Sequence, residues 1–447
     1  TTGAEEPRQN WSRPQRGGGV RPARKGKIEL DGIWTGMTGA VKYFLNVHPD
    51  VKALTETKVE TIRLQYGIEI YAENLPRKEV PKPTDSWETA SMEDCYRDAL
   101  KVTRGFQKPT AIQAQCWPAI ATGNDVIGLA PTGGGKTLAY ALPLLQHVQA
   151  QTEVLPTEGP IGLVLVPSRE LCAQVAREIE SLAAEHPDFR TQVVTMYGGD
   201  GRGKSPKPAL GVDIVVACPG KLFDMLERKE VNLLRASYIV VDEADSMLDT
   251  AERKGEGKAQ GKGEGKAGKS DFEQVREILQ QIRIDRQLVL FTATWQDQIK
   301  QFMTEFSGEA GYLCITVGGM QLSACSDIDQ QFAAPGAKGT PWQDASLSKL
   351  QVLQSVLAKT QDNGFKSLVF VNQKDTIWTV VDFLRAAGMQ SVEGFSAWLN
   401  QGERDKLLTE FAEGRVSILV ATSVLSRGLD VPKLRYVFNF DSPARFG

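Results

Sequence analysis

Residues 125–149 read DVIGLAPTGGGKTLAYALPLLQHVQ. The apolar run Asp125–Leu129 predicts a buried strand, and the amphipathic stretch Leu138–Gln149 predicts a helix. A glycine-rich loop joins them, and the backbone N–H groups of such a loop, with the positive end of the following helix, bind phosphate groups. This segment therefore predicts an α/β protein that binds a phosphate-bearing ligand.

Two polar side chains in this loop have expected roles. Lys136 would reach the outer phosphates of a nucleotide, and the Thr137 hydroxyl would hold Mg²⁺. Ala130 stands where the usual pattern has its first glycine, and its small side chain still allows the turn. The alternative, a glycine-rich turn with a surface lysine, is disfavoured by the strand-loop-helix setting. The predicted nucleotide contacts of the loop are Ala130, Pro131, Thr132, Gly133, Gly134, Gly135, Lys136 and Thr137.

An acidic segment supplies the other groups that a nucleotide site needs. The apolar run Tyr238–Val241 is followed by Asp242-Glu243-Ala244-Asp245, and ligands of open α/β sheets bind at the carboxyl ends of strands. Asp242 is expected to hold Mg²⁺ and Glu243 to orient and deprotonate the attacking water. Alone, these acids would indicate a solvated turn or a helix cap. Together with the phosphate loop they predict nucleotide hydrolysis, with Glu243, Asp242 and Lys136 as catalytic residues.

Outward from these segments, apolar β-branched runs alternate with amphipathic stretches. This alternation predicts α/β units with a parallel sheet covered on both faces. A second set follows the Gly and Pro residues at 335–341, so two α/β domains are expected in tandem. A helix is also predicted around Thr55–Tyr66. The predicted strands are Asp125–Leu129, Ile161–Val166, Gln192–Tyr197, Ile214–Ala217, Tyr238–Val241, Gln287–Phe291, Ser367–Val371, Ser417–Ala421 and Tyr436–Phe440, and the helices are Leu138–Gln149, Glu170–Ala184, Phe272–Ile282, Ser346–Leu357, Asp375–Ala386 and Arg404–Phe411.

Composition excludes several classes of protein. The 447 residues are 41% hydrophobic and 24% charged, with a net charge of −3, which indicates a globular chain of two or three domains and excludes a polycation. Six cysteines without a CxxC pair and three histidines disfavour a structural zinc site and fit a reducing compartment. No apolar run approaches the roughly 20 residues that span a bilayer. We therefore expect an intracellular protein of the nucleus or cytoplasm, without a membrane partner.

Two segments are rich in Gly and basic residues. Residues 1–27 predict a disordered basic tail or linker, with an auxiliary RNA-binding arm as the alternative. Residues 251–270 contain six Lys or Arg against three Glu, a net charge of +3, and predict a surface insertion. The alternative for this insertion is an extra RNA-binding surface.

Taken in chain order, the motifs resemble those of the DEAD-box RNA helicases of superfamily 2. The sequences APTGGGKT at 130–137 and DEAD at 242–245 are similar to the family's nucleotide motifs. GFQKPTAIQ at 105–113 resembles its adenine-reading motif, in which Phe106 would stack on adenine and Gln113 would hydrogen-bond its edge. Lys108 is expected to contact the nucleotide as well. Trp87 stands where the family has an upstream aromatic residue. Coupling of hydrolysis to strand separation is implied for Asp245, Thr292, Ala293 and Thr294.

The resemblance also implies contacts to RNA and to the far side of the nucleotide. Gly428 and Asp430 would approach the nucleotide from the second domain, where FVN at 370–372 and Gln401 with Arg404 also match family motifs. Ser168 and Lys221 replace the family's Thr and Arg, and Lys lacks the bidentate fork of Arg, so the grip on phosphate is expected to weaken modestly. The implied RNA contacts are Pro167, Ser168, Arg169, Gly198, Gly199, Pro219, Gly220, Lys221 and Thr422.

The family implies two RecA-like, P-loop NTPase-type parallel-sheet domains that close on ATP, Mg²⁺ and single-stranded or short duplex RNA, giving local unwinding or remodelling of RNA–protein complexes. Within the family the chain looks closest to the HAGE-type members, which carry an upstream KH domain. A monomer with protein cofactors is expected. The expected organisation is a tail at 1–27, an extension at 28–85, domain 1 at 86–318, a linker and first strand at 319–345, and domain 2 at 346–447.

The chain ends where the family's arginine motif HRxGRxGR would begin, so the second domain is expected to be truncated and hydrolysis to be weak. The alternative function is a noncatalytic ATP- and RNA-binding clamp. DNA in place of RNA also stays open, because backbone contacts alone do not settle the sugar. An unrelated P-loop kinase would not need residues 105–113 or a second α/β domain.

Overall fold

The computed structural model describes residues 39–42, 47–73, 80–198, 210–248, 270–307, 311–319, 328–333, 342–360, 365–396, 398–422, 425 and 431–442. The chain divides into two compact units, the first comprising residues 1–198 and 205–323 and the second residues 199–204 and 324–447. The predicted tail lies outside the described residues, as does the predicted insertion except for Ser270. Among the described residues, no helix combines the length and the apolar character needed to cross a bilayer.

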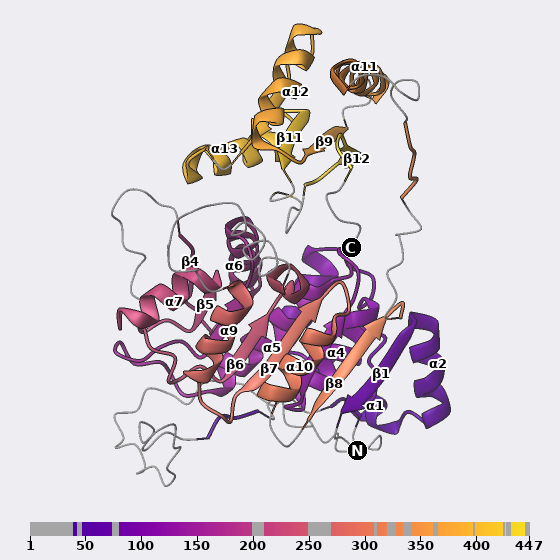
Figure 1. The fold of residues 1–447 in the computed structure, drawn as a ribbon. Coiled ribbons are helices and arrows are strands. Elements are labelled where there is room, and N and C mark those ends of the chain that lie inside the picture. Colours follow the sequence, from indigo (N-terminus) through magenta and orange to yellow (C-terminus); the bar gives the residue numbers. More distant parts are fainter. Residues whose placement is uncertain are drawn as a thin grey trace, which may run out of the picture. The chain divides into compact units, whose positions relative to one another are not determined.

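The first unit contains one eight-stranded sheet, in the order β1-β8-β2-β7-β6-β3-β5-β4 (Figure 1). All neighbouring strands are parallel except β1 and β8. The predicted α/β class with parallel sheets is therefore confirmed. The strands are β1 (Ile68–Glu73), β2 (Asp125–Leu129), β3 (Gly162–Leu165), β4 (Val193–Met196), β5 (Ile214–Ala217), β6 (Tyr238–Val241), β7 (Gln287–Thr292) and β8 (Tyr312–Val317).

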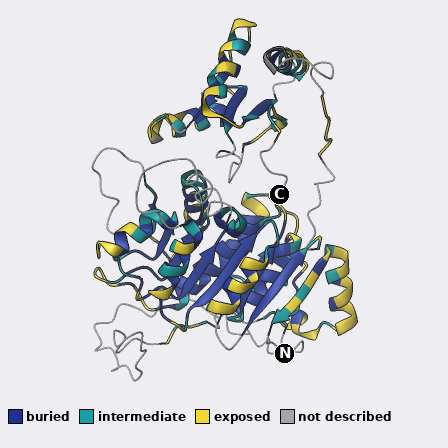
Figure 2. Ribbon diagram, in the orientation of Figure 1, coloured by how far each residue is buried: buried dark blue, intermediate teal, exposed yellow. Residues whose placement is uncertain are grey.

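Buried residues on alternate positions of these strands belong to two separate cores. On β6, Val240 joins one buried cluster, whereas Ile239 and Val241 join the other. The first cluster is completed by α4, α5 and α6, and the second by α7, α9 and α10. Figure 2 shows the resulting buried central strands. The helices of this unit are α1 (Pro49–Ala53), α2 (Glu56–Tyr66), α3 (Asp94–Asp98), a π-helical turn (Ala99–Thr103), α4 (Ala111–Ala121), α5 (Lys136–Ala150), α6 (Arg169–Ala183), α7 (Pro219–Glu227), α9 (Asp271–Gln280) and α10 (Asp297–Phe306).

Strand β1 comes from the region expected to be an N-terminal extension. It runs antiparallel to β8, with Ile68 opposite Val317, and neither strand was predicted. Helix α2 ends at Gly67, whose φ of 62° lets the chain turn directly into β1. Arg63 of α2 donates to Gln115 Oε1 of α4 (3.0 Å) and to the carbonyl of Pro81 (3.1 Å). The extension is thereby joined to the sheet and to α4 of the first unit.

The second unit contains a four-stranded parallel sheet in the order β10-β11-β9-β12. Strand β12 alternates between partly buried and exposed residues, as an edge strand does. Helix α13 begins with a capping box in which the Asn400 side chain accepts from Glu403 N and the Glu403 carboxylate accepts from Asn400 N. Strand β10 was not predicted. The elements are α11 (Trp342–Thr360), β9 (Lys366–Val371), α12 (Lys374–Ala386), β10 (Val392–Phe395), α13 (Gln401–Ala412), β11 (Ile418–Thr422) and β12 (Leu434–Asn439).

Candidate nucleotide and nucleic-acid site

The glycine-rich loop joins β2 to α5 as predicted. Gly135 is the N-cap of α5 and has a φ of 87°, a conformation open chiefly to glycine. A Cβ atom on Gly135 would lie 2.4 Å from Gln113 Nε2, so the loop and α4 are in close contact there. Lys136 is 9% exposed, and its Nζ donates to the carbonyl oxygen of Ala130 at 3.0 Å. The lysine therefore points back into the loop that it is predicted to serve.

The first turn of α4 holds this loop from the other side. Thr110 and Gln113 form a capping box, in which Thr110 N donates to Gln113 Oε1 at 3.0 Å. The Gln113 amide donates to the carbonyl of Gly135 at 3.0 Å, and the Thr110 hydroxyl to that of Gly134 at 2.8 Å. The predicted adenine-reading residue thus contacts the phosphate loop directly. Thr110 was not predicted as a site residue, although its spacing from Gln113 is that of a capping box.

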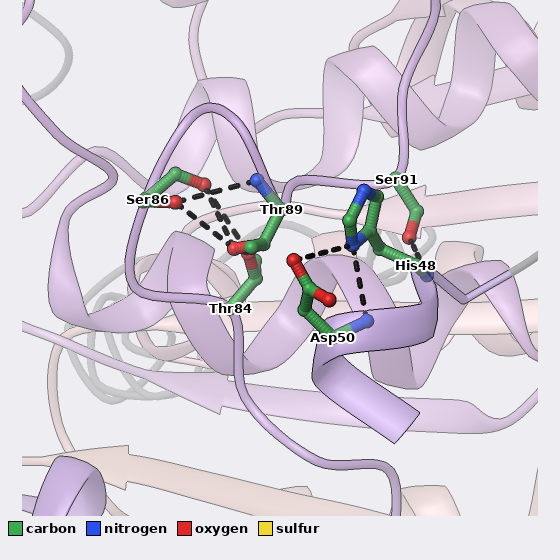
Figure 3. Close-up of polar contacts among 6 residues, drawn as sticks. All are labelled: His48, Asp50, Thr84, Ser86, Thr89 and Ser91. Atoms are coloured by element: carbon green, nitrogen blue, oxygen red, sulfur yellow. Dashed lines mark hydrogen bonds and ion pairs between the residues drawn. The ribbon is translucent and has the colours of Figure 1, made fainter. Parts of the chain in front are cut away.

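The segment before α4 presents Phe106, the predicted adenine-stacking residue. Its side chain is 43% exposed, and its carbonyl accepts the indole N–H of the buried Trp87 at 2.9 Å. Trp87 lies in a loop closed by hydroxyl contacts from Thr89 to Thr84 (2.9 Å) and Ser86 (3.1 Å) (Figure 3). These contacts fix the backbone behind Phe106 while leaving its ring accessible.

Two further contacts join this loop and the segment after Phe106 to the N-terminal part of the unit. Ser91 Oγ accepts from His48 N at 3.0 Å, which joins the loop of Figure 3 to the start of α1. The Lys108 ammonium lies 5.0 Å from the centre of the Tyr66 ring of α2, within reach of a cation–π interaction. The predicted nucleotide residue Lys108 is thus placed against the N-terminal part of the unit.

The predicted catalytic acids follow β6. Asp242 is 3% exposed; its Oδ2 accepts from the Tyr140 hydroxyl and its Oδ1 from Glu243 N, both at 2.9 Å. Burial raises the pKa of Asp242, and the charge of Lys136 opposes that rise. Glu243 has a φ of 52°, a strained conformation for a residue with a side chain, and its N–H bond to Asp242 helps to hold it.

Asp245 connects this acidic segment to the residues after β7. Its Oδ2 accepts from both the backbone N (3.0 Å) and the hydroxyl (2.8 Å) of Thr294. The Thr292 hydroxyl donates to the carbonyl of Thr294 at 2.9 Å, and the Thr292 carbonyl accepts from Ala130 N at 3.2 Å. Thr292, Ala293 and Thr294 therefore form a continuous link between the acidic segment and the start of the phosphate loop.

The predicted RNA residues of the first unit follow the remaining three strands. Ser168 after β3 caps α6, its hydroxyl accepting from Leu171 N at 3.2 Å, and Arg169 is the first residue of that helix. Gly198 follows β4, whereas Gly199 lies outside the described residues. Pro219, Gly220 and Lys221 form the first turn of α7 after β5, and Pro167 follows β3.

One edge of the sheet therefore carries, in a fixed order, the described motifs that follow the strands of this unit. Read along β2, β7, β6, β3, β5 and β4, it presents the phosphate loop, the threonine segment, the acids, Pro167–Arg169, Pro219–Lys221 and Gly198. Carboxyl ends of parallel strands are where open α/β sheets bind ligands. The predicted nucleotide groups occupy one half of this edge and the predicted RNA groups the other half.

In the second unit, Thr422 ends β11 and is half-buried, and Gly428 and Asp430 lie outside the described residues. Asn372 follows β9; its backbone N donates to Asp441 Oδ2 at 3.0 Å and its side chain to the carbonyl of Ser442 at 2.8 Å. The segment at 370–372, which resembles a family motif, thus meets the residues after β12 through Asn372, Asp441 and Ser442.

Glu93, Cys95 and His186 place possible metal-ligand atoms within 4.8 Å of one another. However, His186 Nε2 lies 2.7 Å from Glu93 Oε2, and its Nδ1 accepts from Asp188 N at 3.2 Å. A metal-bound imidazole usually donates through its second nitrogen, which is an acceptor here. Burial, with the charge of Glu93, raises the pKa of Cys95 to about 11 and keeps it a thiol. The cluster is thus a hydrogen-bonded contact between the start of α3 and the segment after α6.

Comparison with known proteins gives matches in both units. Residues 110–260 match the family model described as DEAD/DEAH box helicase, and residues 348–446 match the Helicase conserved C-terminal domain. The ATP-dependent RNA helicase dbp2 of Neosartorya fischeri is 36% identical over 407 residues, which cover 90% of this chain and 67% of that protein. DBP2 of Meyerozyma guilliermondii is 35% identical over 408 residues, 90% of this chain and 66% of that protein. The chain spans about two thirds of the length of these relatives.

A solved structure shows a similar architecture. S. cerevisiae Dbp5 bound to RNA and ADP BeF3 superimposes with a TM-score of 0.62 at 25% sequence identity. The match covers 80% of this chain and 81% of that one. The predicted RecA-like character of the two α/β units is therefore confirmed.

Proposed function

Since the chain belongs to the DEAD/DEAH box helicase family, as an ATP-dependent RNA helicase of the DEAD-box type, we propose a division of work along the sheet edge of its first unit. ATP is bound and hydrolysed at the ends of β2, β7 and β6, and RNA backbone is held at the ends of β3, β5 and β4. The order of the motifs along this edge is the observation that carries the proposal.

The nucleotide half uses the phosphate loop and the acids. When ATP binds, the Lys136 ammonium exchanges its hydrogen bond to the Ala130 carbonyl for one to the outer phosphates. Hydrogen bonds to charged phosphate oxygens are stronger than those to a neutral carbonyl. Thr137 and Asp242 offer the hard oxygen donors that Mg²⁺ prefers, and Asp242 is already turned toward α5 by Tyr140. A Mg²⁺ ion held by these two side chains would neutralise charge that develops on the phosphate oxygens. Glu243 accepts a proton from the attacking water.

Adenine recognition comes from the start of α4 and the segment before it. Phe106 has the exposed ring needed for stacking on a base, and the hydrogen bond from Trp87 holds its backbone. Gln113 exchanges its contact with the Gly135 carbonyl for the adenine edge. Because Gln113 and Thr110 also touch the phosphate loop, adenine binding and the shape of that loop are linked through the same side chains.

The RNA half offers helix starts and glycines rather than base-reading side chains. The first turns of α6 and α7 present backbone N–H groups near Arg169 and Lys221, which suit phosphate oxygens. Binding should therefore tolerate many sequences. The second unit contributes Thr422 to RNA, and Gly428 and Asp430 to the nucleotide, when the two units close on both ligands.

The decisive test compares Glu243→Gln with the wild type and with Glu180→Gln, which changes an exposed acid of α6 in the same way. Loss of a general base costs roughly 10²–10⁴-fold in rate. We expect Glu243→Gln to lose RNA-stimulated ATP turnover by that factor and to retain ATP and RNA binding, and Glu180→Gln to match the wild type. Turnover that survives in Glu243→Gln would refute the assigned base. Binding of both ligands without RNA-stimulated turnover in the wild type would favour a noncatalytic clamp.

A further inference from the structure

The buried phenol of Tyr140 is the side chain that contacts Asp242 from α5. Tyr140 lies in the second turn of α5 and is fully buried. Its hydroxyl donates to Asp242 Oδ2 at 2.9 Å, across 102 positions of sequence. Its ring packs against Phe291 of β7, with the ring centres 5.5 Å apart, and its backbone carbonyl accepts from the Tyr238 hydroxyl at 3.2 Å. Ring and backbone are thus both held in place around the hydroxyl.

The Tyr140 hydroxyl joins the two elements of the predicted Mg²⁺ site. Tyr140 lies on α5 three residues after Thr137, and its hydroxyl donates to Asp242, which follows β6. A phenol is protonated at neutral pH and can therefore act as this donor.

We propose that Tyr140 is a positioning residue that fixes the Asp242 carboxylate in the orientation that binds Mg²⁺–nucleotide. This inference rests on the proposed function of the same site. With Oδ2 held by Tyr140 and Oδ1 by Glu243 N, the Asp242 carboxylate has a single orientation before the metal arrives. Outer partners that orient metal ligands typically change metal affinity or activity by roughly 10–100-fold when they are removed. Phenylalanine at this position would fill the same space and lose only that control.

The test measures binding rather than turnover, using the full chain and a fluorescent ADP analogue titrated at increasing Mg²⁺. We expect Tyr140→Phe to raise the Mg²⁺ concentration for half-maximal tightening about 10-fold. ADP affinity without Mg²⁺ should stay within about twofold of the wild type. The matched control is Tyr238→Phe, which removes an equally buried hydroxyl that donates only to the Tyr140 backbone. It should keep the wild-type Mg²⁺ dependence.

Two outcomes would overturn the proposal: an unchanged Mg²⁺ midpoint in Tyr140→Phe, or equal shifts in both tyrosine variants, which would mean that buried hydroxyls act only through packing. Asp242→Asn separates the inference from its premise. If Asp242→Asn retained the wild-type Mg²⁺ dependence, the metal role of Asp242 would itself be wrong. If Asp242→Asn lost that dependence while Tyr140→Phe kept it, only the positioning role would fail.

Discussion

Asp125 and His147 are buried side chains whose charge states bear on stability rather than on the reaction. Asp125 begins β2, its Oδ1 accepts from Leu288 N at 2.8 Å, and burial raises its pKa to about 7. His147 of α5 contacts the Ser237 hydroxyl at 2.9 Å, and burial lowers its pKa to about 3. Folding therefore favours the neutral form of both groups.

The two groups give opposite slopes of stability with pH. In unfolded chains their pKa values are near 3.9 and 6.5. The Asp125 contribution is fully present below about pH 4 and is lost as the pH rises to about 7. The His147 contribution is fully present above about pH 6.5 and is lost as the pH falls toward 3. Between about pH 4 and 6.5 the two slopes offset each other.

Replacing Asp125 by Asn should leave, of these two, only the pH dependence of stability that comes from His147. The Asn amide oxygen can still accept from Leu288 N, and the side chain at position 125 no longer has an ionisable group. We expect the stability difference, variant minus wild type, to rise with pH between about 4 and 7 by up to about 1.4 kcal/mol per pH unit. It should be constant above that range. Hydrogen exchange of the β2 and β7 amides over a pH series measures it, and a difference that does not vary with pH would contradict the buried, neutral Asp125.

Thr294 should govern the coupling of hydrolysis to strand separation. Thr294→Val removes the hydroxyl that donates to Asp245 and keeps the shape and the backbone bond, whereas Thr294→Ser keeps the hydroxyl. Hydrogen bonds to charged groups contribute about 1.5–3 kcal/mol. We expect Thr294→Val to unwind short duplex RNA at least about 10-fold more slowly per ATP hydrolysed. Parallel assays of unwinding and ATPase check this, and equal ratios in the Val and Ser variants would contradict it.

Candidate site residues could be predicted from sequence where the signal lay within one short motif. Lys136 in its glycine-rich loop and Asp242 after an apolar run could be assigned because strand, loop and helix follow one another locally. The contact between Tyr140 and Asp242 could not be, because the partners are 102 positions apart and a tyrosine on an apolar helix face indicates core packing. Likewise, no local pattern showed that Gln113 would contact the carbonyl of Gly135.

Among the elements, most strands with uniform apolar runs were predicted closely, whereas the apolar strand β8 and the mixed strands β1 and β10 were missed. Strand β5 was placed at the observed bounds Ile214–Ala217, because all four residues are buried and two are β-branched valines. Strand β1 alternates Ile and Glu on a partly covered surface, and β10 has only four residues with a glycine among them. Their pairing depends on the tertiary partners β8 and β11, which the sequence pattern does not specify.

Arg63 joins helix α2 to α4 through a hydrogen bond to Gln115. Arg63→Ala removes two hydrogen bonds, to Gln115 and to the Pro81 carbonyl, and should lower the local stability of α2 and β1 by about 1–3 kcal/mol. Thr61→Ala is the control, since its exposed hydroxyl bonds only the Thr57 carbonyl within the same helix. Hydrogen exchange of residues 56–73 measures both. Equal protection in the two variants would show that Arg63 does not hold α2.

At the scale of the whole molecule, the buried clusters fall into two independent sets. Two clusters cover the faces of the eight-stranded sheet, and two more, with Leu357 and Phe411 among their members, cover the sheet of the second unit. No cluster of the described residues contains members from both units. Each unit therefore has the core that independent folding requires.

Separate cores predict separate unfolding transitions. Phe411→Ala in the second unit and Phe302→Ala in the first each remove a fully buried ring, at a cost of about 3–5 kcal/mol. We expect calorimetry to resolve two transitions, with each variant lowering a different one. ADP with Mg²⁺ should raise the transition that Phe302→Ala lowers. A single transition shifted by both variants would contradict independent units.

The pairing of β1 with β8 bears on the colloidal behaviour of shortened versions of this protein. Strand β8 is buried at five of its six positions, and β1 covers the hydrogen-bonding edge that lies opposite β2. In a version that begins after Glu73, the backbone N–H and C=O groups along that edge of the apolar strand β8 would be unpaired. Such an edge can pair with a strand of another copy. Such a version should bind amyloid-type dyes and precipitate, whereas one that begins before α2 should stay dispersed. By pairing with β8, strand β1 is thus expected to prevent strand addition between copies of the protein.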